Sequence, residues 1–188
     1  MATNGSDDEF QRTLAAARVG AEWAWRDLYR EAAPRVLRFL RARKALEPED
    51  VLGDVFLQAV KNLHAFQGSA GDFHAWLLTI ARNRVVDLAR SAARRPISAG
   101  PDGMRRLPAA DPDPAMAAEH HAAQLRVRKV IDGLSPDQRD VMLLRVLSGL
   151  TLAETAGVLG KSVGAVKALQ VRAVARIRRQ MAEETVPL

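Results

Sequence analysis

The sequence predicts an all-α fold of two small helical domains joined by a flexible linker. Apolar residues recur at helical spacing before residue 94 and after residue 117, and no stretch of useful length alternates as a strand would. Between these parts, residues 94–117 hold five of the nine prolines, together with Gly100 and Gly103. A segment of this composition cannot bury enough apolar surface to fold by itself. We therefore expect domains at residues 8–93 and 118–182.

Composition narrows the function classes before any motif is considered. The 188 residues carry a formal charge of +6 with a pI near 10.4, which favours a polyanionic partner such as nucleic acid or an anionic membrane surface. No window approaches the roughly 18 consecutive apolar residues of a membrane span, and Asp7, Asp8 and Glu9 stand where a signal peptide would be basic. We expect a soluble, cytoplasmic protein without membrane insertion. The absence of cysteine excludes disulfides, thiolate zinc sites and a thiol redox switch.

The first domain is predicted to be a bundle of four helices, interrupted at Pro34, at Pro48 and at residues 68–71. Acidic residues flank Pro48 in the first turn of a helix over residues 47–63, where they offset the positive end of the helix dipole. The apolar side chains of this helix share one face: Leu52, Phe56, Ala59 and Leu63. Its polar side chains share another: Asp50, Asp54, Gln58 and Lys61. By pattern alone this is an amphipathic surface helix.

The helix predicted over residues 73–93 has two chemically different sides. Its apolar stripe consists of Leu77, Ala81, Val85, Leu88 and Ala92. The opposite side carries stacking, amide and guanidinium groups that suit unpaired bases and backbone phosphate. These groups belong to Trp76, Asn83, Asp87, Arg90 and Arg94. A tryptophan inside an apolar run also suits a core position, so the pattern leaves both roles of Trp76 open.

The second domain contains sharp helix signals. Ser135 and Gln138 can form a capping box around Pro136, which suits the first helical position. Thr151 and Glu154 can form a second capping box. Helices are therefore predicted to begin beside Ser135 and Thr151.

A helix-turn-helix is predicted between Leu152 and Leu169. Gly160 stands at the turn, where a positive φ is required, and the small Ala156 lets the second helix approach closely. The first helix presents the apolar face Leu152, Ala156 and Leu159. The second follows a cap at Ser162 and is predicted to pack through Val163, Val166, Ala173 and Ile177. Residues 161–180 hold six basic side chains and no acidic one. This is typical of a major-groove recognition helix, and a solvated basic face is the alternative.

Two stretches resemble the extracytoplasmic-function (ECF) sigma factors, the small promoter-recognition subunits of bacterial RNA polymerase. EPEDVLGDVFLQAVKNL (47–63) followed by FHAWLLTIARNRVVDLARSAARR (73–95) resembles their second conserved region. LSPDQRDVMLLRVLSGLTLAETAGVLGKSVGAVKALQVRAVARIRR (134–179) resembles their fourth. The two stretches come in the family's order, and the short linker leaves no room for the intervening domain of larger sigma factors.

The resemblance implies an initiation subunit of the polymerase holoenzyme that has no catalytic activity, cofactor or small-molecule substrate of its own. Its implied partners are promoter DNA and core RNA polymerase, the latter contacted at the clamp region of the β′ subunit and at the β flap. An anti-sigma factor is a further candidate partner. The implied polymerase contacts are Glu49, Asp50, Asp54 and Gln58.

The resemblance also assigns residues to each of two promoter elements. Recognition and melting of the downstream element fall to Gln67, Gly68, Ser69, Asp72, Trp76, Arg82, Asn83, Arg84, Asp87, Arg90 and Arg94, with Arg95 adding attraction to the DNA backbone. Recognition of the upstream element in the major groove falls to Lys161, Ser162, Ala165, Lys167, Ala168, Arg172, Arg176 and Arg179. Ala165 and Ala168 stand where relatives commonly carry threonine and a small polar residue, which leaves the base preference there open.

Two other functions are compatible with parts of the sequence. A conventional helix-turn-helix regulator, which binds a palindrome as a dimer, explains residues 134–180 but leaves residues 47–95 without a role. A small helical enzyme or metal protein would have to use His64, His74, His120 and His121. Those histidines lack HExxH spacing, and the sequence has no phosphate-binding glycine loop.

Overall fold

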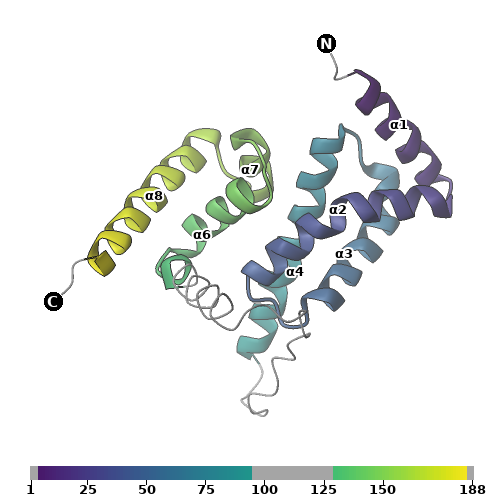
Figure 1. The fold of residues 1–188 in the computed structure, drawn as a ribbon. Coiled ribbons are helices and arrows are strands. Elements are labelled where there is room, and N and C mark those ends of the chain that lie inside the picture. The colour runs from purple at the N-terminus through teal and green to yellow at the C-terminus, as the bar shows by residue number, and fades with distance from the viewer. Residues whose placement is uncertain (1–3, 95–128, 186–188) are drawn as a thin grey trace, which may run out of the picture.

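The computed structural model describes residues 4–94 and 129–185, and all regular structure within those ranges is helical. The helices form two groups, which Figure 1 shows in purple to teal and in green to yellow. The all-α prediction is therefore confirmed. Residues 95–117 of the predicted linker, with Arg95 among them, and His120 and His121 lie outside the described residues.

The N-terminal group contains four helices, the predicted number, although the first two are separated at residues 19–21 rather than at Pro34. They are α1 (Asn4–Arg18), α2 (Glu22–Ala42), α3 (Pro48–Asn62) and α4 (Ala70–Arg94), with a one-turn 3-10 helix η1 (Leu63–Ala65) after α3. Helices α2, α3 and α4 pack against one another, and α1 packs on α2. The side chains of Phe39, Val55, Phe73 and Leu77 are almost fully buried at the centre of this bundle.

Pro34 does not interrupt a helix, contrary to the prediction, because α2 runs through it. A proline inside a helix removes one backbone hydrogen bond and costs about 3 kcal/mol. Pro34 is itself exposed, whereas Ala33 and Val36 on the neighbouring positions are buried. Packing of this face against the core thus offsets the lost hydrogen bond.

Within the described residues, the C-terminal group comprises the helical residues 129–132 and four named elements. These are α6 (Pro136–Met142), the π-helical turn η2 (Leu143–Leu147), α7 (Leu152–Leu159) and α8 (Val163–Thr185). Helix α8 packs on α6 and α7. Val141, Leu144, Val166 and Ala173 are buried between these helices.

The predicted caps and turn of the C-terminal group are all confirmed. Ser135 with Gln138, and Thr151 with Glu154, form complete capping boxes. The Ser162 hydroxyl accepts a hydrogen bond from the Ala165 amide at 3.2 Å, and so caps α8. Gly160 ends α7 with φ 60° and ψ 36°, the left-handed conformation that glycine adopts without steric cost.

Two of the predicted apolar stripes extend too far. On α8, Val166 and Ala173 are buried, but Val163 is 47% exposed because it is the first residue of the helix. On α4, Leu77, Ala81 and Val85 are buried. Leu88 is 37% exposed and Ala92 is exposed as well, since the last turns of α4 extend past the helices that cover its middle.

The two helical groups contact each other directly. Helix α7 packs on α4, and η2 packs on α2. Between the groups, the Asp140 carboxylate of α6 forms ion pairs with Arg43 at 3.1 Å and Arg82 at 3.0 Å. Lys44 and Asp132 form a further ion pair at 2.7 Å. One side of this contact belongs to the predicted domain 8–93, and the other side belongs to the predicted domain 118–182.

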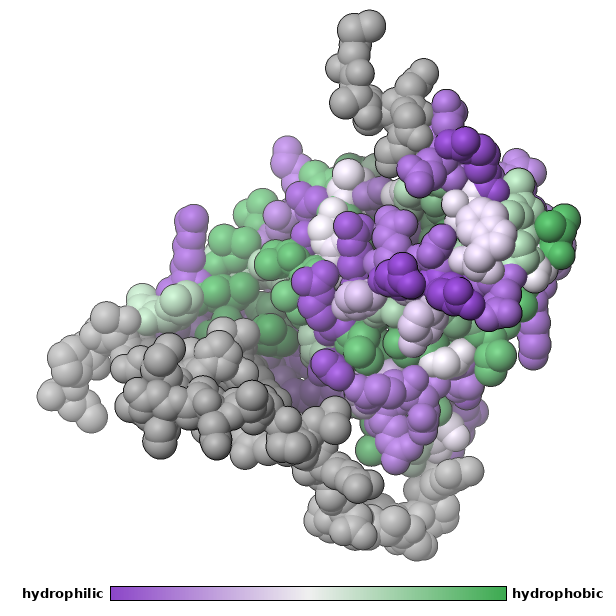
Figure 2. Space-filling model, turned by 45° about the vertical axis from the view of Figure 1, so that its right-hand side comes forward, coloured by the Kyte–Doolittle hydropathy of each residue, from purple (hydrophilic) through white to green (hydrophobic). Residues whose placement is uncertain are grey.

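Among the described helices, none is long and apolar enough to cross a membrane. On the face drawn in Figure 2, hydrophilic residues are interleaved with small hydrophobic patches. Scattered exposed apolar residues of this kind are normal for a folded surface.

Candidate nucleic-acid and polymerase interface

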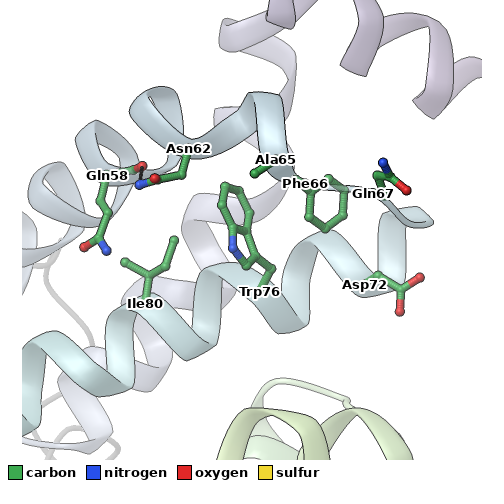
Figure 3. A pocket seen from close by; sticks show the side chains of 8 residues that line it. All are labelled: Gln58, Asn62, Ala65, Phe66, Gln67, Asp72, Trp76 and Ile80. Carbon is green, nitrogen blue, oxygen red and sulfur yellow. Dashed lines mark hydrogen bonds between the residues drawn. The ribbon is translucent and has the colours of Figure 1, made fainter.

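An open pocket of about 590 Å³ lies between α3 and the first half of α4. We call it the α3–α4 pocket. It is lined by Gln58, Asn62, Ala65, Phe66, Gln67, Asp72, Trp76 and Ile80. Figure 3 shows the Trp76 ring in the middle of the row, with the two amide side chains of α3 toward one end and Gln67 and Asp72 at the other. The pocket therefore combines a flat aromatic surface with hydrogen-bonding groups.

Trp76 packs against the core and also lines the pocket. Its ring packs on Phe66 and Phe73, with centroids 5.1 Å and 5.8 Å away. It is nevertheless only half-buried, and its remaining surface lines the pocket. An aromatic ring held from behind and open in front is a suitable platform for an unstacked base.

Asp72 organises the loop that closes one end of the pocket. Its Oδ2 accepts hydrogen bonds from the Ser69 amide at 2.9 Å and the Ser69 hydroxyl at 2.8 Å. These bonds lower the pKa of Asp72, because they stabilise the ionised carboxylate. Gly68 has φ 150°, and a Cβ on it would lie 2.7 Å from the Asp72 Cβ. The loop therefore requires glycine at this position.

Beyond the pocket, one face of α4 continues the row of polar groups. Asn83, Asp87, Arg90 and Arg94 are exposed and follow Trp76 at helical spacing. From Trp76 to Arg94 this face is roughly 27 Å long at 1.5 Å per residue. Two other arginines of the predicted set are engaged within the protein, Arg82 with Asp140 and Arg84 with Asp54.

The acidic residues predicted on α3 are all on its outer side, and two of them are paired. Glu49 accepts a hydrogen bond from Arg41 at 2.6 Å, which lowers the Glu49 pKa. Asp54 pairs with Arg84 at 2.6 Å. The pKa of Glu47 is raised by a hydrogen bond and charge repulsion from Asp50, so negative charge is concentrated where α3 begins. Gln58 lies in the α3–α4 pocket as well as on this outer side.

Helix α8 presents its basic residues on two different faces. Arg172, Arg176 and Arg179 are exposed and follow Ala165 and Ala168 at helical spacing. Lys167 and Arg178 instead border a groove of about 430 Å³, whose lining includes the apolar residues Leu152, Val171 and Val174 and a third basic residue, Arg145.

The start of the helix-turn-helix is held by contacts within its own group. Lys161 pairs with Asp137 at 3.0 Å. The Ser162 hydroxyl is used as the cap of α8. Of the basic residues predicted for the upstream element, the structure therefore gathers Arg172, Arg176 and Arg179 on one face.

Comparison with known proteins identifies the two helical groups. Residues 28–95 match the family model for Sigma-70 region 2, and residues 124–177 match the model for Sigma-70, region 4. The chain is 32% identical to the ECF RNA polymerase sigma factor BldN of Streptomyces coelicolor, in an alignment of 190 positions that covers 97% of this chain and 70% of BldN. It is also 32% identical to ShbA of Streptomyces griseus, over 85% of this chain and 88% of ShbA.

The chain belongs to the ECF RNA polymerase sigma factors. The resemblance seen in the sequence is thereby confirmed.

Solved structures agree with the fold of this sigma factor. CnrH, solved in complex with the cytosolic domain of CnrY, superposes with a TM-score of 0.68 at 26% identity, covering 92% of this chain and 97% of CnrH. RpoE of Bartonella quintana, solved with the anti-sigma factor NepR, superposes with a TM-score of 0.61 at 23% identity, covering 83% of this chain and 97% of RpoE.

Family membership decides between the functions that the sequence left open. A conventional helix-turn-helix regulator would explain the region 4 match but not the region 2 match at residues 28–95. In the described part of the chain, no group of three or more histidine, cysteine or acidic side chains is placed to hold a metal ion. His64 is exposed, whereas His74 is buried at the interface of α4 with α2 and α7.

Sequence reasoning missed several residues of the α3–α4 pocket in this sigma factor. Asn62, Ala65, Phe66 and Ile80 line it but were assigned no role. Phe66 could have been found from its place beside the predicted loop, since a large apolar residue next to Gln67 and Gly68 must pack somewhere near. Asn62 gave no such signal, because its place depends on how α3 and α4 cross.

Proposed function

We propose that this sigma factor captures an unstacked base of the downstream promoter element in the α3–α4 pocket. As an ECF sigma factor, it directs core RNA polymerase to promoters. Extruding a base costs a few kcal/mol, which stacking and hydrogen bonds in a pocket must offset. The half-buried ring of Trp76, with Gln58 and Asn62 at one side and Gln67 at the other, supplies both kinds of interaction.

The exposed face of α4 would then guide the single strand away from the pocket. Asn83 can hydrogen-bond to a base or sugar, and Arg90 and Arg94 can neutralise phosphates. Asp87 lies between Asn83 and Arg90 in the sequence. Its negative charge would repel phosphate at that turn of α4. Single-strand contacts of this kind hold the melted promoter open.

We propose that α8 binds the upstream element in the major groove. Support comes from the exposed row of Arg172, Arg176 and Arg179, which shares its face with Ala165 and Ala168. Arginine contacts phosphate and guanine, while an alanine methyl group can contact the methyl group of thymine. Lys167 lies on the flank beside the apolar groove and would reach only the edge of such an interface.

Two surfaces are proposed to bind core polymerase. The outer side of α3, with Glu49, Asp50 and Asp54, would contact the clamp region of the β′ subunit. The apolar groove bordered by Lys167 and Arg178 faces away from the proposed DNA side of α8 and would receive the β flap. Separate faces for DNA and polymerase allow both to bind at once.

We further propose that the chain is a non-catalytic subunit that acts in the cytoplasm, where polymerase and DNA are present. An anti-sigma factor remains a proposed partner. Support for a protein partner of this kind comes from the similar chain CnrH, which was solved in complex with the cytosolic domain of CnrY.

The base-capture proposal is tested with the fluorescent base 2-aminopurine. The analogue is placed at successive positions of the non-template strand of a promoter, and holoenzyme is added. We expect fluorescence to rise when promoter melting unstacks the analogue, and to fall at one position where Trp76 stacks on it. Trp76→Ala should abolish that position-specific decrease while the neighbouring increases remain. Equal signals at all positions with both proteins would contradict capture in this pocket.

A further inference from the structure

Two side chains of α1 hold the backbone of the loop that closes the α3–α4 pocket. Gln11 Nε2 donates a hydrogen bond to the Gly68 carbonyl at 2.8 Å, and Arg18 Nη2 donates one to the Phe66 carbonyl. The donors precede their acceptors by 57 and 48 residues. Neither residue belongs to the surfaces proposed above for DNA or polymerase.

Helix α1 is itself firmly attached to the bundle. Leu14 and Ala17 are buried, and Phe10 packs on Phe73 with ring centroids 5.8 Å apart. The Trp25 indole donates a hydrogen bond to the Ala17 carbonyl at 3.1 Å, which ties the end of α1 to α2. The two donors are therefore presented from a rigid support.

We propose that Gln11 and Arg18 are positioning residues for recognition of the downstream promoter element. This proposal rests on the proposed function of the α3–α4 pocket. Asp72 holds the loop from the α4 side through Ser69, and the two α1 donors hold it from the other side. A loop fixed in one conformation keeps its polar groups in the geometry that suits one base and cannot rearrange to suit another, so the pocket discriminates between bases.

The test compares holoenzymes on single-stranded non-template oligonucleotides that carry the mapped downstream element and its single-base changes. Gln11→Glu keeps the shape of the side chain but places a carboxylate oxygen against the Gly68 carbonyl. Arg12→Gln is the matched control, because it lowers the net charge by the same amount on the same helix, and Arg12 Nε donates within α1, to the Asp8 carbonyl at 3.4 Å. We expect Gln11→Glu to lower discrimination at one or two base positions about fivefold, as the loss of one hydrogen bond would.

Substitutions of Arg18 test the same proposal independently, by the same measurement of base discrimination. Arg18→Lys keeps one charged donor and should retain most of the discrimination, whereas Arg18→Met should lose it. Affinity for core polymerase and for upstream duplex DNA should stay unchanged in all variants. Unchanged base discrimination in both Gln11→Glu and Arg18→Met would overturn the proposal, and so would a parallel loss of polymerase affinity, which indicates general unfolding. If the unmodified protein shows no base discrimination at all, it is the function of the pocket that fails.

A separate observation concerns Asp140, a buried carboxylate between the two helical groups. It is 2% exposed and lies between the guanidinium groups of Arg43 and Arg82. Asp140 Oδ1 lies 3.1 Å from Arg43 Nη1 but makes no hydrogen bond of good geometry within the described residues, and neither does Arg43 Nε. Buried ion pairs are costly to desolvate and stabilise a contact well only when all their polar atoms are satisfied. This contact is specific in geometry but should separate readily.

The contact between the two helical groups covers part of the proposed DNA surface of α4. The Arg82 side chain is only 22% exposed, because Asp140 covers it. Near the start of α4, a Cβ on Gly71 would lie 2.8 Å from Glu154 Oε1, so α7 places a carboxylate close to the pocket loop. A negative charge there opposes the approach of a DNA backbone.

We infer that this arrangement is a closed resting form, in which α6 and α7 cover Arg82 and the start of α4, and that it opens before promoter binding. The opening leaves two guanidinium groups without Asp140, and these can then bind phosphate. The inference also rests on the proposed DNA role of α4, but it depends on the Asp140 contact rather than on the loop.

The absence of native cysteine allows a direct test. Lys44→Cys with Asp132→Cys replaces an ion pair that joins the groups, and a bis-maleimide reagent with a reducible spacer links the two thiols across the longer distance that the lysine side chain spans. Glu22→Cys with Arg26→Cys, a pair within α2, is the control. We expect the linked protein to lose promoter transcription about tenfold or more and to regain it on reduction, while the control is unaffected. Equal transcription by the linked and reduced forms would overturn the closed form, and failure of the two cysteines to link would contradict the contact itself.

Asp140→Asn provides a second measurement. It removes the charge but keeps the shape, and we expect several-fold tighter binding to duplex DNA. Weaker or unchanged DNA binding by a variant that keeps its helical content would contradict the inference.

Discussion

Arg84 donates from both Nε and Nη2 to Oδ2 of Asp54, at 3.0 Å and 2.6 Å, and thereby ties α4 to α3. The family resemblance assigns Arg84 to DNA and Asp54 to polymerase. The structure brings them together, so the two proposed binding surfaces share one ion pair. Binding on one surface can therefore alter the charge that the other presents.

This pair gives a test that separates stability from binding. Both side chains are about half exposed, so either Arg84→Ala or Asp54→Ala should lower the free energy of unfolding by no more than about 1 kcal/mol. The charge swap Asp54→Arg with Arg84→Asp should restore stability in urea denaturation. It should not restore affinity for core polymerase. Recovery of polymerase affinity in the swap would show that Asp54 acts only through the pair.

Arg172 tests the proposed DNA face of α8. Arg172→Ala should weaken binding to duplex DNA of the upstream element and reduce the salt dependence by roughly one phosphate contact. Polymerase affinity, measured by fluorescence anisotropy of labelled protein, should be unchanged. Arg30→Ala removes an exposed positive charge on α2, in the other helical group, and serves as the control. An equal loss of polymerase and DNA affinity in Arg172→Ala would contradict the assignment.

Asn83 tests the proposed role of α4 in melting. Asn83→Ala should slow formation of the open complex more than it weakens the closed complex, because the amide would contact bases that are exposed only after melting. Permanganate reactivity of unpaired thymines, followed over time, measures this step. A melting rate equal to that of the unmodified protein would remove Asn83 from the site.

His74 predicts a pH dependence of stability. Burial lowers the pKa of His74, and the Arg35 charge adds to this, while Glu31 and Glu154 act in the opposite direction. Because the folded protein binds the proton less readily than the unfolded chain, stability is complete above the ordinary pKa of 6.5 and declines as the pH falls below it. The lowered pKa values of Asp72 and Glu49 act only at more acidic pH, since their ordinary values are 3.8 and 4.5.

Thermal unfolding between pH 7 and pH 5 checks this dependence. The melting temperature of the unmodified protein should fall over this range, and His74→Leu should fall less. Parallel declines in the two proteins would exclude His74 as the cause.

Local sequence signals predicted the framework of the fold well. The capping boxes at Ser135 and Thr151 and the turn at Gly160 are determined by residues next to one another, and all three occur as predicted. Pro34 was misread because the packing of Ala33 and Val36 outweighs a local helix-breaking signal. Val163 and Leu88 were misplaced because periodicity shows which side of a helix is apolar, but not where its partner ends.

The candidate site depends on longer-range contacts and was predicted only in part. The family motifs indicated Trp76, Gln67 and Asp72, which do meet in one pocket. Gln11 and Arg18 carry no local signal for their bonds to the loop, because their partners lie far along the chain. The sequence likewise predicts that Arg82 binds DNA. Only the fold shows that Arg82 donates a hydrogen bond to Asp140.

The central claim is tested most directly by multi-round transcription in vitro with sigma-free core polymerase, the purified protein and fragmented genomic DNA of its own bacterium. We predict discrete transcript starts that require this protein and share two upstream sequence elements. Binding to core polymerase without any such starts, or no binding after co-purified inhibitors are removed, would contradict the account.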